Sequence, residues 1–268
     1  MKVGIYFNRH KIEAEKLEKI LSDVASKVEV SFIREINEDV EDVEENLDLL
    51  IALGGDGTVL KAFHRIMDVR IPVLGVNFGK LGFLTPHHPE DMRKLLDTVV
   101  KRRYKTMELP VFEVEFKGRK FKGLNDLVVF KRRTSGILEI SVKINGKDLG
   151  IIPADGVTVC TPIGSTAYNL SNGGAILHPS VEAFELSFIA PHIMSARPIV
   201  IGFERSNIEI SLLDEDDAEI LIDGLHVGSM KSGDILFIKI TRDKAKLLVL
   251  EDKDYCELLV EKLGWGRR

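Results

Sequence analysis

The residues of this chain most able to do chemistry form a short glycine-rich segment, Gly54–Thr58, which reads GGDGT. An apolar run at 49–53 precedes it and an amphipathic run at 59–63 follows it, which predicts a strand, a tight turn and a helix. Such a turn lets backbone N–H groups contact an anion at a helix N-terminus. Because Asp56 also places a carboxylate inside the turn, the segment indicates phosphoryl transfer to a hydroxyl rather than phosphate binding alone.

A plainer interpretation makes Asp56 a helix-capping residue and nothing more. Capping does not require two glycines before the aspartate and one after it, so we favour a functional turn. Lys61 follows one helical turn later. It is equally consistent with a surface lysine and with a phosphate partner.

A second cluster, at 77–84, reads NFGKLGFL and follows an apolar strand expected at 71–77. It therefore lies at the carboxyl edge of a sheet, where ligands bind in doubly wound folds. Its two glycines imply special backbone angles or close approach of a ligand. Phe78 and Phe83 are better explained as core or pocket-wall residues than as specific stacking partners.

A third cluster is the polar pair Asn125 and Asp126, inside an apolar run from 124 to 130. A polar pair in such a run must find hydrogen bonds or lose solvation energy. A turn would explain the pair without any ligand. An amide beside a carboxylate also suits adenine edges and ribose hydroxyls, because together they offer donors and acceptors.

The densest cluster runs from 155 to 174, where an expected strand leads into a loop rich in glycine and hydroxyl groups. From Gly164 onward this loop reads GSTAYNLSNGG, a combination that a generic loop seldom shows. Its hydroxyls could bind an adenine or a ribose. Tyr168 offers a ring on which a base could stack.

The order of the expected elements indicates two architectures in one chain. Strands and helices alternate across 1–103, which predicts a Rossmann-like, doubly wound α/β domain. Strands then recur at short spacing, with turn signals at Lys117-Gly118 and Asn145-Gly146, which predict an all-β sandwich domain at 104–250. Residues 251–268 return to helical periodicity and are expected to pack back on the first domain.

The individual elements follow from the same periodicities. In the first part we expect strands at 2–7, 28–33, 49–53 and 71–77, with helices at 11–26 and 89–103. In the second we expect strands at 111–116, 120–125, 127–131, 138–144, 156–161, 183–190, 207–213, 218–222, 234–240 and 244–250, and then a helix at 252–264. An acidic segment at 35–45 is best explained as a solvated face.

The composition excludes several classes of protein. The chain has 268 residues, of which 44% are hydrophobic and 29% charged, as in ordinary globular proteins. Its net charge of −5 argues against a nucleic-acid partner, and no apolar stretch has membrane-spanning length. We therefore expect a cytoplasmic protein without a nucleic-acid or membrane partner.

Residue usage adds two further expectations. Two cysteines exclude a disulfide-dense scaffold, and the seven histidines show no convincing metal spacing. Glutamine is absent while lysine and glutamate are abundant, which suggests a thermophilic source.

Taken together and in order, the four clusters strongly resemble the NAD kinase family, and the resemblance covers almost the whole chain. The first matches the family's GGDGT, and the second matches its N-x-G-x-L-G-F-L. The loop at 164–174 matches the family's longest motif, while Pro191-His192 with Ser195–Pro198 matches a further one. GGDGT alone is similar in lipid kinases and phosphofructokinases, whereas the full ordered set is highly specific.

Three positions depart from the family pattern. Asp126 replaces the usual Glu, which keeps the charge but shortens its reach. Ile163 replaces the usual Thr before Gly164 and removes a hydroxyl. Leu225 stands where a Gln is common, which puts in doubt any contact from that position.

The resemblance implies the reaction and the partners. An NAD kinase transfers a phosphoryl group from ATP, or another donor such as polyphosphate, to the adenosine 2′-hydroxyl of NAD, and the product is NADP. The family has the two-domain fold expected above and uses a divalent metal such as Mg²⁺. It forms homodimers and homotetramers, in which a neighbouring subunit completes the NAD site.

The resemblance also implies the residues of the site. The phosphate-donor loop comprises Gly54, Gly55, Gly57 and Thr58. The NAD-binding residues are Asp56, Gly57, Lys61, Phe78, Asn125, Asp126, Asp155, Ser165, Thr166, Ala167, Tyr168, Asn169, Leu170 and Ser171. Asp155 is expected at the ribose hydroxyls or the nicotinamide end.

Asp56 is the candidate catalytic residue, as general base for the 2′-hydroxyl. A helix N-terminus stabilises a carboxylate and so makes it a poorer base. A loose phosphoryl-transfer transition state needs little early deprotonation, so a weak base can suffice. Asp56 could instead chiefly orient the hydroxyl or help to hold Mg²⁺, for which no dedicated protein cage is evident.

Two other classes of function stay open on the residues alone. The chain could be a lipid or sugar kinase that shares only GGDGT, against which the motif at 164–171 argues. It could instead be an inactive dinucleotide-binding sensor, against which an intact Asp56 argues. Donor preference, use of NADH, oligomer size and feedback by NADP have no signature that can be read in the sequence.

Overall fold

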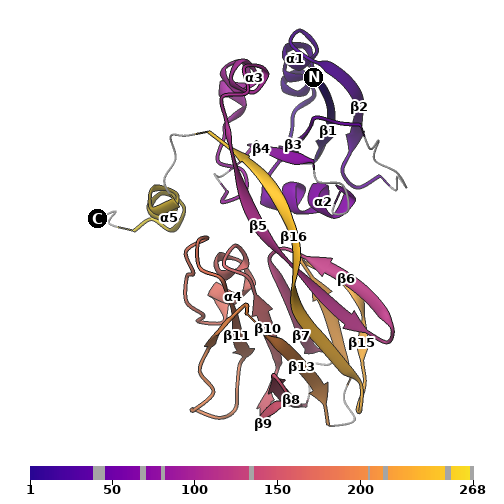
Figure 1. Ribbon diagram of the computed structural model, residues 1–268, viewed down its shortest axis with the longest axis vertical. Coiled ribbons are helices and arrows are strands. Elements are labelled where there is room, and N and C mark those ends of the chain that lie inside the picture. The colour runs from indigo at the N-terminus through magenta and orange to yellow at the C-terminus, as the bar shows by residue number, and fades with distance from the viewer. Residues whose placement is uncertain are drawn as a thin grey trace. The chain divides into compact units, whose positions relative to one another are not determined.

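The computed structural model describes residues 1–38, 46–66, 71–79, 82–132, 136–204, 206–213, 217–250 and 255–265. Part of the acidic segment, at 39–45, therefore lies outside the described residues, as do Lys80, Leu81 and the first residues of the expected C-terminal helix. Contacts divide the chain into two compact units (Figure 1). Unit one comprises Met1–Leu109 and Lys244–Arg268, and unit two comprises Pro110–Asp243.

Unit one is built on a parallel sheet, in the order β2-β1-β3-β4, which the end of β16 extends beside β4. These strands are β1 (Lys2–Phe7), β2 (Glu29–Glu35), β3 (Leu49–Gly54), β4 (Pro72–Asn77) and β16 (Ile235–Val249). β3 is buried along its whole length, as expected for the continuous apolar run of a central parallel strand. This sheet brings the ends of β3 and β4 together, with Gly54 beside Asn77.

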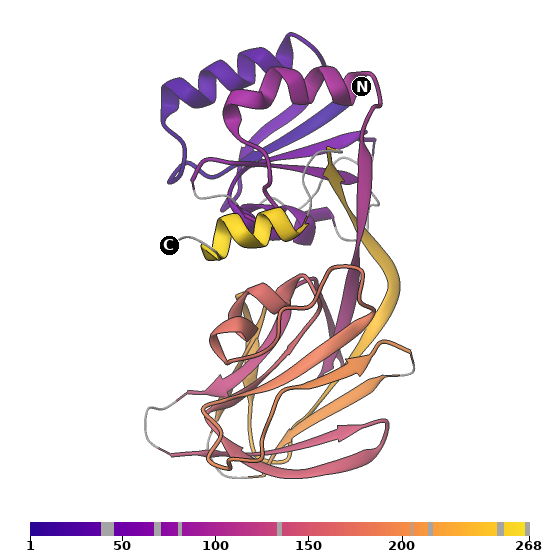
Figure 2. The same ribbon diagram turned by 90° about the vertical axis from the view of Figure 1, so that its left-hand side faces the viewer.

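Helices cover both faces of that sheet. α1 (Ala14–Ala25) and α3 (Met92–Val100) lie on one face, and α2 (Asp56–Ile66) lies on the other (Figure 2). Apolar side chains at helical spacing form the contacts, such as Ile20 and Val24 of α1. A short helix, η1 (Pro89–Asp91), precedes α3, and α5 (Tyr255–Leu263) belongs to unit one as well.

Unit two is a β-sandwich. One sheet has the order β12-β11-β10-β7-β14-β15, and the other runs β16-β13-β8-β9, with β5 beside β16 and β6 beside β5. Their inner faces share one apolar core, to which Val157 and Leu186 contribute from the first sheet and Ile140 and Ile210 from the second. Its strands and short helices are β5 (Lys105–Phe116), β6 (Arg119–Gly123), β7 (Asp126–Lys131), β8 (Leu138–Ile144), β9 (Lys147–Ala154), β10 (Gly156–Cys160), η2 (Gly164–Thr166), α4 (Tyr168–Ser171), β11 (Ala183–Ile189), β12 (Ile199–Gly202), β13 (Asn207–Leu212), β14 (Ala218–Ile222) and β15 (Leu225–Met230).

The expected fold class, an α/β part followed by a β-sandwich, is confirmed. Three strands were not expected from the sequence, and they are β9, β12 and β15. Each lies at the edge of its sheet, and most of its side chains are exposed or only partly buried. Such a strand lacks the alternation of apolar and polar residues by which a strand is recognised in a sequence. The two strands expected at 234–240 and 244–250 are one continuous strand, β16.

The division into units differs from the boundaries expected at 103 and 250. β5 begins in unit one and ends in unit two, and β16 passes back the other way, with the chain returning to unit one at Lys244. The amino-acid composition does not mark a unit boundary that lies inside a strand, because the residues on both sides of the boundary have the pattern of the same strand. Among the described residues, no helix combines the length and apolar character needed to span a membrane.

Candidate functional site

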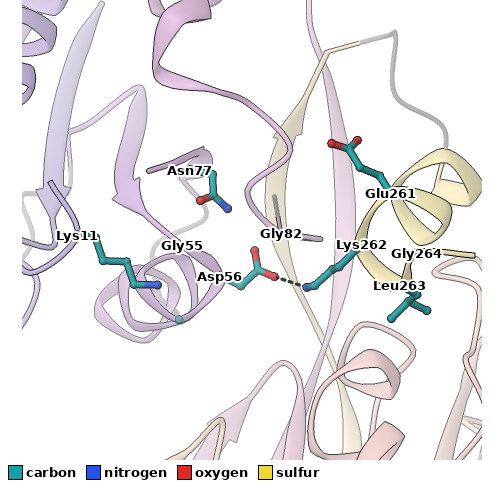
Figure 3. Close-up of a pocket in the computed structure, with 10 residues that line it drawn as sticks. Lys11, Gly55, Asp56, Asn77, Gly82, Glu261, Lys262, Leu263 and Gly264 are labelled. Atoms are coloured by element: carbon teal, nitrogen blue, oxygen red, sulfur yellow. Dashed lines mark hydrogen bonds and ion pairs between the residues drawn. The ribbon is translucent and has the colours of Figure 1, made fainter. Parts of the chain in front are cut away.

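A pocket of about 830 Å³ lies in unit one, at the carboxyl ends of β3 and β4 (Figure 3). This is the edge at which open α/β sheets bind their ligands. Its lining residues come from the GGDGT turn, from the 77–84 segment, from the loop after β1 and from α5. They are Lys11, Gly55, Asp56, Gly57, Asn77, Gly82, Glu261, Lys262, Leu263 and Gly264.

The carboxylate of Asp56 accepts hydrogen bonds from four donors. Its Oδ2 accepts from the backbone N–H of Phe83 at 2.9 Å, and from the ammonium group of Lys262 at 3.1 Å. Its Oδ1 accepts from the backbone N–H of Leu84 at 3.0 Å, and from the hydroxyl of Thr85 at 2.9 Å. A carboxylate has about four lone-pair positions, so these four donors use them all.

Two glycines make this arrangement sterically feasible. A Cβ on Gly82 would overlap Oδ1 of Asp56, so only glycine lets this segment close around the carboxylate. A Cβ on Gly54 would overlap the side chain of Thr58, which is buried and accepts from the N–H of Gly55 at 3.4 Å. Gly54 and Thr58 therefore shape the turn from inside, whereas Gly55 and Gly57 line the pocket.

A buried amide supports the same carboxylate from behind. Asn77 is 3% exposed, and its Nδ2 donates to the hydroxyl of Thr85 at 2.7 Å. Because that hydroxyl then donates to Asp56, the polar residue at the end of β4 orients the residue at the start of α2. Hydrogen bonds thus join the GGDGT turn to the 77–84 segment and the threonine that follows it.

The sequence did not identify three charged pocket residues, Lys11, Glu261 and Lys262. Lys11 lies close to the turn, because its Nζ would be 3.1 Å from a Cβ placed on Gly55. Its position had a usable signal, since the loop after parallel strand β1 opens on the same edge as the loop after β3. No local pattern marks the two residues of α5.

Two residues of the expected site lie elsewhere in unit one. The ammonium group of Lys61 donates to Oδ1 of Asn37 at 2.6 Å, and it is not part of the pocket lining. Asn37 is in turn held by the buried carboxylate of Glu35. The ring of Phe78 packs against the core of unit one. These contacts favour structural roles for both residues.

In unit two, the polar pair Asn125-Asp126 meets the turn between β14 and β15. The carboxylate of Asp223 accepts from the backbone N–H groups of Leu124, Asn125 and Asp126, at 2.9, 2.7 and 3.1 Å. Asp223 and Gly224 both have positive φ, as the two central residues of a tight Asp-Gly hairpin turn do. The turn therefore fixes the backbone of the pair.

The glycine-rich loop packs against the same backbone. A Cβ on Gly164 would overlap the carbonyl of Asn125, so glycine is required for this close approach. The amide oxygen of Asn125 is buried and has no hydrogen-bond partner among the described residues. An orphaned buried acceptor is costly, and it fits a position that a ligand donor completes.

Burial, and after it the neighbouring charge of Asp223, raise the pKa of Asp126 to about 7, although the backbone N–H of Tyr168 acts in the opposite direction. An unfolded aspartate has a pKa near 3.9, so between about pH 4 and pH 7 the folded chain holds a proton that the unfolded chain has released. The stability of the fold therefore falls as the pH rises through that window.

Asp126→Asn is expected to abolish this part of the pH dependence, because an amide resembles the protonated acid and cannot ionise. Relative to the unmodified protein, the variant should gain of the order of 1–4 kcal/mol in unfolding free energy between pH 4.5 and pH 8. Urea unfolding at both pH values measures the gain. Parallel stability profiles for the two proteins would contradict it.

Within the loop at 164–171, the expected NAD-binding residues separate into two groups. Ser165 and Asn169 are fully buried. Ser165 bonds to Pro162 and Leu177, and the amide of Asn169 bridges the buried Glu185 and Ser187. These side chains support the loop from inside. The accessible residues are Thr166, Ala167, Tyr168, Leu170 and Ser171.

Asp155 is not part of this group. It precedes β10, whereas Asp126 pairs with Cys160 at the other end of that strand. At about 3.3 Å per residue the two ends are about 16 Å apart. The carboxylate of Asp155 instead pairs with Lys131 at 2.6 Å. Of the departures from the family pattern, Ile163 is buried and Leu225 is exposed.

Comparison with known proteins gives a consistent result. Residues 3–104 match the family described as the ATP-NAD kinase N-terminal domain, and residues 124–250 match the ATP-NAD kinase C-terminal domain. A protein from Sulfurimonas denitrificans named NAD kinase is 34% identical over 261 residues, which cover 94% of this chain and 91% of that protein.

Solved structures are similar as well. The crystal structure of an NAD kinase from Archaeoglobus fulgidus in complex with ATP has a TM-score of 0.76 at 26% identity, with 94% of each chain covered. The crystal structure of yeast NADH kinase complexed with NADH has a TM-score of 0.88 at 22% identity, over 100% of this chain and 88% of that chain. At 22% identity, the similarity to the yeast enzyme shows a shared fold and nothing more.

Proposed function

Because the chain belongs to the NAD kinase family, we propose that Asp56 and the pocket around it transfer the γ-phosphoryl group of ATP to NAD. The acceptor is the 2′-hydroxyl of the adenosine ribose, and the products are NADP and ADP. The observation that carries the proposal is one carboxylate held beside a glycine turn at a helix N-terminus, in a pocket that also contains two lysines.

The chemistry of this pocket suits phosphoryl transfer. In the proposed step, a bond forms between the ribose O2′ and the γ-phosphorus, while the bond from that phosphorus to the β–γ bridging oxygen breaks. ADP takes the electron pair, and the hydroxyl proton passes to Asp56. The positive end of α2 and the ammonium groups of Lys11 and Lys262 stabilise the phosphate charge.

A divalent metal such as Mg²⁺ fits the pocket only in company with the donor. No cluster of three or more metal-binding side chains occurs among the described residues, and the pocket offers two carboxylates, Asp56 and Glu261. Mg²⁺ commonly binds through one or two carboxylates and the substrate phosphates. Glu261 would hold it together with those phosphates, and Asp56 would do so only after one of its four hydrogen-bond donors has left. When bound, the metal neutralises phosphate charge.

The NAD-binding residues of unit two remain part of the proposal. The orphaned acceptor of Asn125 supports it, and so do the accessible loop residues Thr166, Ala167, Leu170 and Ser171. Tyr168, which is 44% exposed, supports it as well. We further propose a homodimer or homotetramer. The outward-facing apolar residues Ile151, Ile235 and Phe237 of unit two support an association surface.

Tyr168→Ala is expected to raise the KM for NAD by about 5- to 100-fold, because a base stacked on an aromatic ring is worth roughly 1–3 kcal/mol. The turnover at saturating NAD should change much less. Steady-state kinetics with NAD varied separates the two effects, and Val100→Ala is a control at an exposed apolar side chain of α3 in unit one. A fall in kcat larger than the rise in KM would show that Tyr168 positions the reacting groups instead.

The direct test is NADP formation from NAD, with ATP and polyphosphate as donors in parallel reactions containing Mg²⁺. NADP formation with either donor supports the proposal. Phosphorylation of diacylglycerol or fructose 6-phosphate in place of NAD would identify a lipid or sugar kinase. Binding of NAD without any phosphoryl transfer would identify a dinucleotide sensor.

A further inference from the structure

The carboxylate of Asp56 cannot accept a further proton donor in the described arrangement. Its four hydrogen-bond donors occupy the positions that the acceptor hydroxyl would need. If Asp56 is to receive the 2′-hydroxyl, one donor must first leave. The proposed function therefore requires a change at Asp56, and the structure indicates which contact breaks.

Three of the four donors are fixed in place. The N–H groups of Phe83 and Leu84 belong to a backbone that Gly82 holds against the carboxylate. The hydroxyl of Thr85 is fully buried and is itself oriented by Asn77. Releasing any of these would require the segment to unfold locally. Only Lys262 is a long, flexible side chain, and it donates from α5 at 3.1 Å.

Lys262 is also placed to meet the phosphate donor. Lys262 lines the pocket together with Gly55, Gly57 and Lys11 (Figure 3). The two lysines thus place two positive charges in the pocket that contains the glycine turn. The ammonium group of Lys262 also lies over the ring of Phe83, 4.1 Å from the ring centre, which keeps its stem inside the pocket. A triphosphate carries more negative charge than a single carboxylate and competes well for this ammonium group.

We propose that Lys262 is a donor-binding and positioning residue that exchanges partners during the reaction. Before the donor binds, it pairs with Asp56. When donor phosphates occupy the glycine turn, the ammonium group moves to them, and Oδ2 of Asp56 becomes free to accept the 2′-hydroxyl. This inference rests on the proposed function, and it names the residue through which donor binding prepares the base.

The first test measures the affinity of inorganic tripolyphosphate by calorimetry without divalent metal. Lys262→Met, which keeps the length of the side chain and loses its charge, should weaken binding by roughly 10- to 100-fold, the worth of a charged hydrogen bond. Lys262→Arg should restore most of the affinity. Lys94→Met, on the exposed face of α3, is the matched control and should bind as the unmodified protein does.

The second test distinguishes partner exchange from simple repulsion between two anions. Asp56→Asn should tighten tripolyphosphate binding, because Lys262 then has no competing carboxylate. The same substitution in a Lys262→Met background should give little or no gain, because the released cation is absent. An equal gain in both backgrounds would overturn the exchange, and so would no gain in either.

These measurements separate the inference from the proposed function. If the unmodified protein forms NADP but Lys262→Met binds tripolyphosphate with unchanged affinity, the role of Lys262 is wrong and the function stands. If tripolyphosphate binding depends on Lys262 and no NADP is formed, the function is wrong. In active enzyme, Lys262→Met should raise the KM for ATP more than the KM for NAD.

Discussion

Replacing Asp56 with asparagine is expected to lower kcat by about 10²- to 10⁴-fold, the usual effect of removing a positioned acid–base group. The loss should appear in kcat at saturating ATP and NAD, and neither KM should rise. NADP formation, followed by a coupled assay, measures it directly.

The reason lies in the donors around this side chain. The carboxylate accepts from two backbone N–H groups and one buried hydroxyl. An asparagine has one acceptor oxygen, and its NH₂ group would face one of these donors, which costs a buried hydrogen bond. The variant therefore loses the proton acceptor, and the geometry of the remaining oxygen changes as well.

Asp91→Asn is the appropriate control, because it makes the same chemical change at an exposed aspartate of unit one. It should leave kcat unchanged. Thermal unfolding of both variants tests whether the loss reflects chemistry rather than folding. Near-normal turnover in folded Asp56→Asn would remove Asp56 from its catalytic role.

Gly82→Ala is expected to be almost as damaging as the loss of Asp56, with kcat lowered by about 10²-fold or more. The φ angle of Gly82 lies outside the left-handed region, so alanine is not excluded by its backbone conformation. The added Cβ instead overlaps Oδ1 of Asp56 and also meets the hydroxyl of Thr85. Because backbone N–H groups hold the carboxylate, it cannot move aside without losing them.

This substitution should also lower the unfolding free energy by about 1–3 kcal/mol, the usual cost of overpacking. Activity and urea unfolding measured on one preparation test both effects. Gly202→Ala is the control, since a Cβ at Gly202 would contact nothing within 4 Å. A Gly82→Ala variant with full activity would show that Asp56 does not need the 82–85 segment around it.

Much of the fold could be predicted from local patterns. The unbroken apolar run of β3, followed by glycines and an amphipathic helix, specifies strand, turn and helix because each signal lies within a few residues. The edge strands β9, β12 and β15 could not be predicted in this way. These strands form because they hydrogen-bond to the neighbouring strand of the sheet. Since most of their side chains are exposed or only partly buried, their residues do not alternate between apolar and polar.

The sequence by itself therefore identified the two segments that line the pocket of unit one, which are the GGDGT turn and the 77–84 segment. It also identified two segments that pack together in unit two, which are the Asn125-Asp126 pair and the loop at 164–174. Their glycines mark close approaches, which are properties of the local backbone. Only the tertiary structure decided which of their side chains are accessible to a ligand and which are buried or paired with other residues. Asn169 is buried against Glu185, and Lys61 bonds to Asn37.

The same dependence on distant contacts explains the residues that the sequence did not reveal. Lys262 reaches Asp56 across a separation of 206 residues, and no pattern within α5 records that contact. Whether a lysine is a solvated surface residue or the partner of a carboxylate in a pocket depends on what packs beside it. That is set by how the chain returns to unit one, and not by the residues on either side of the lysine.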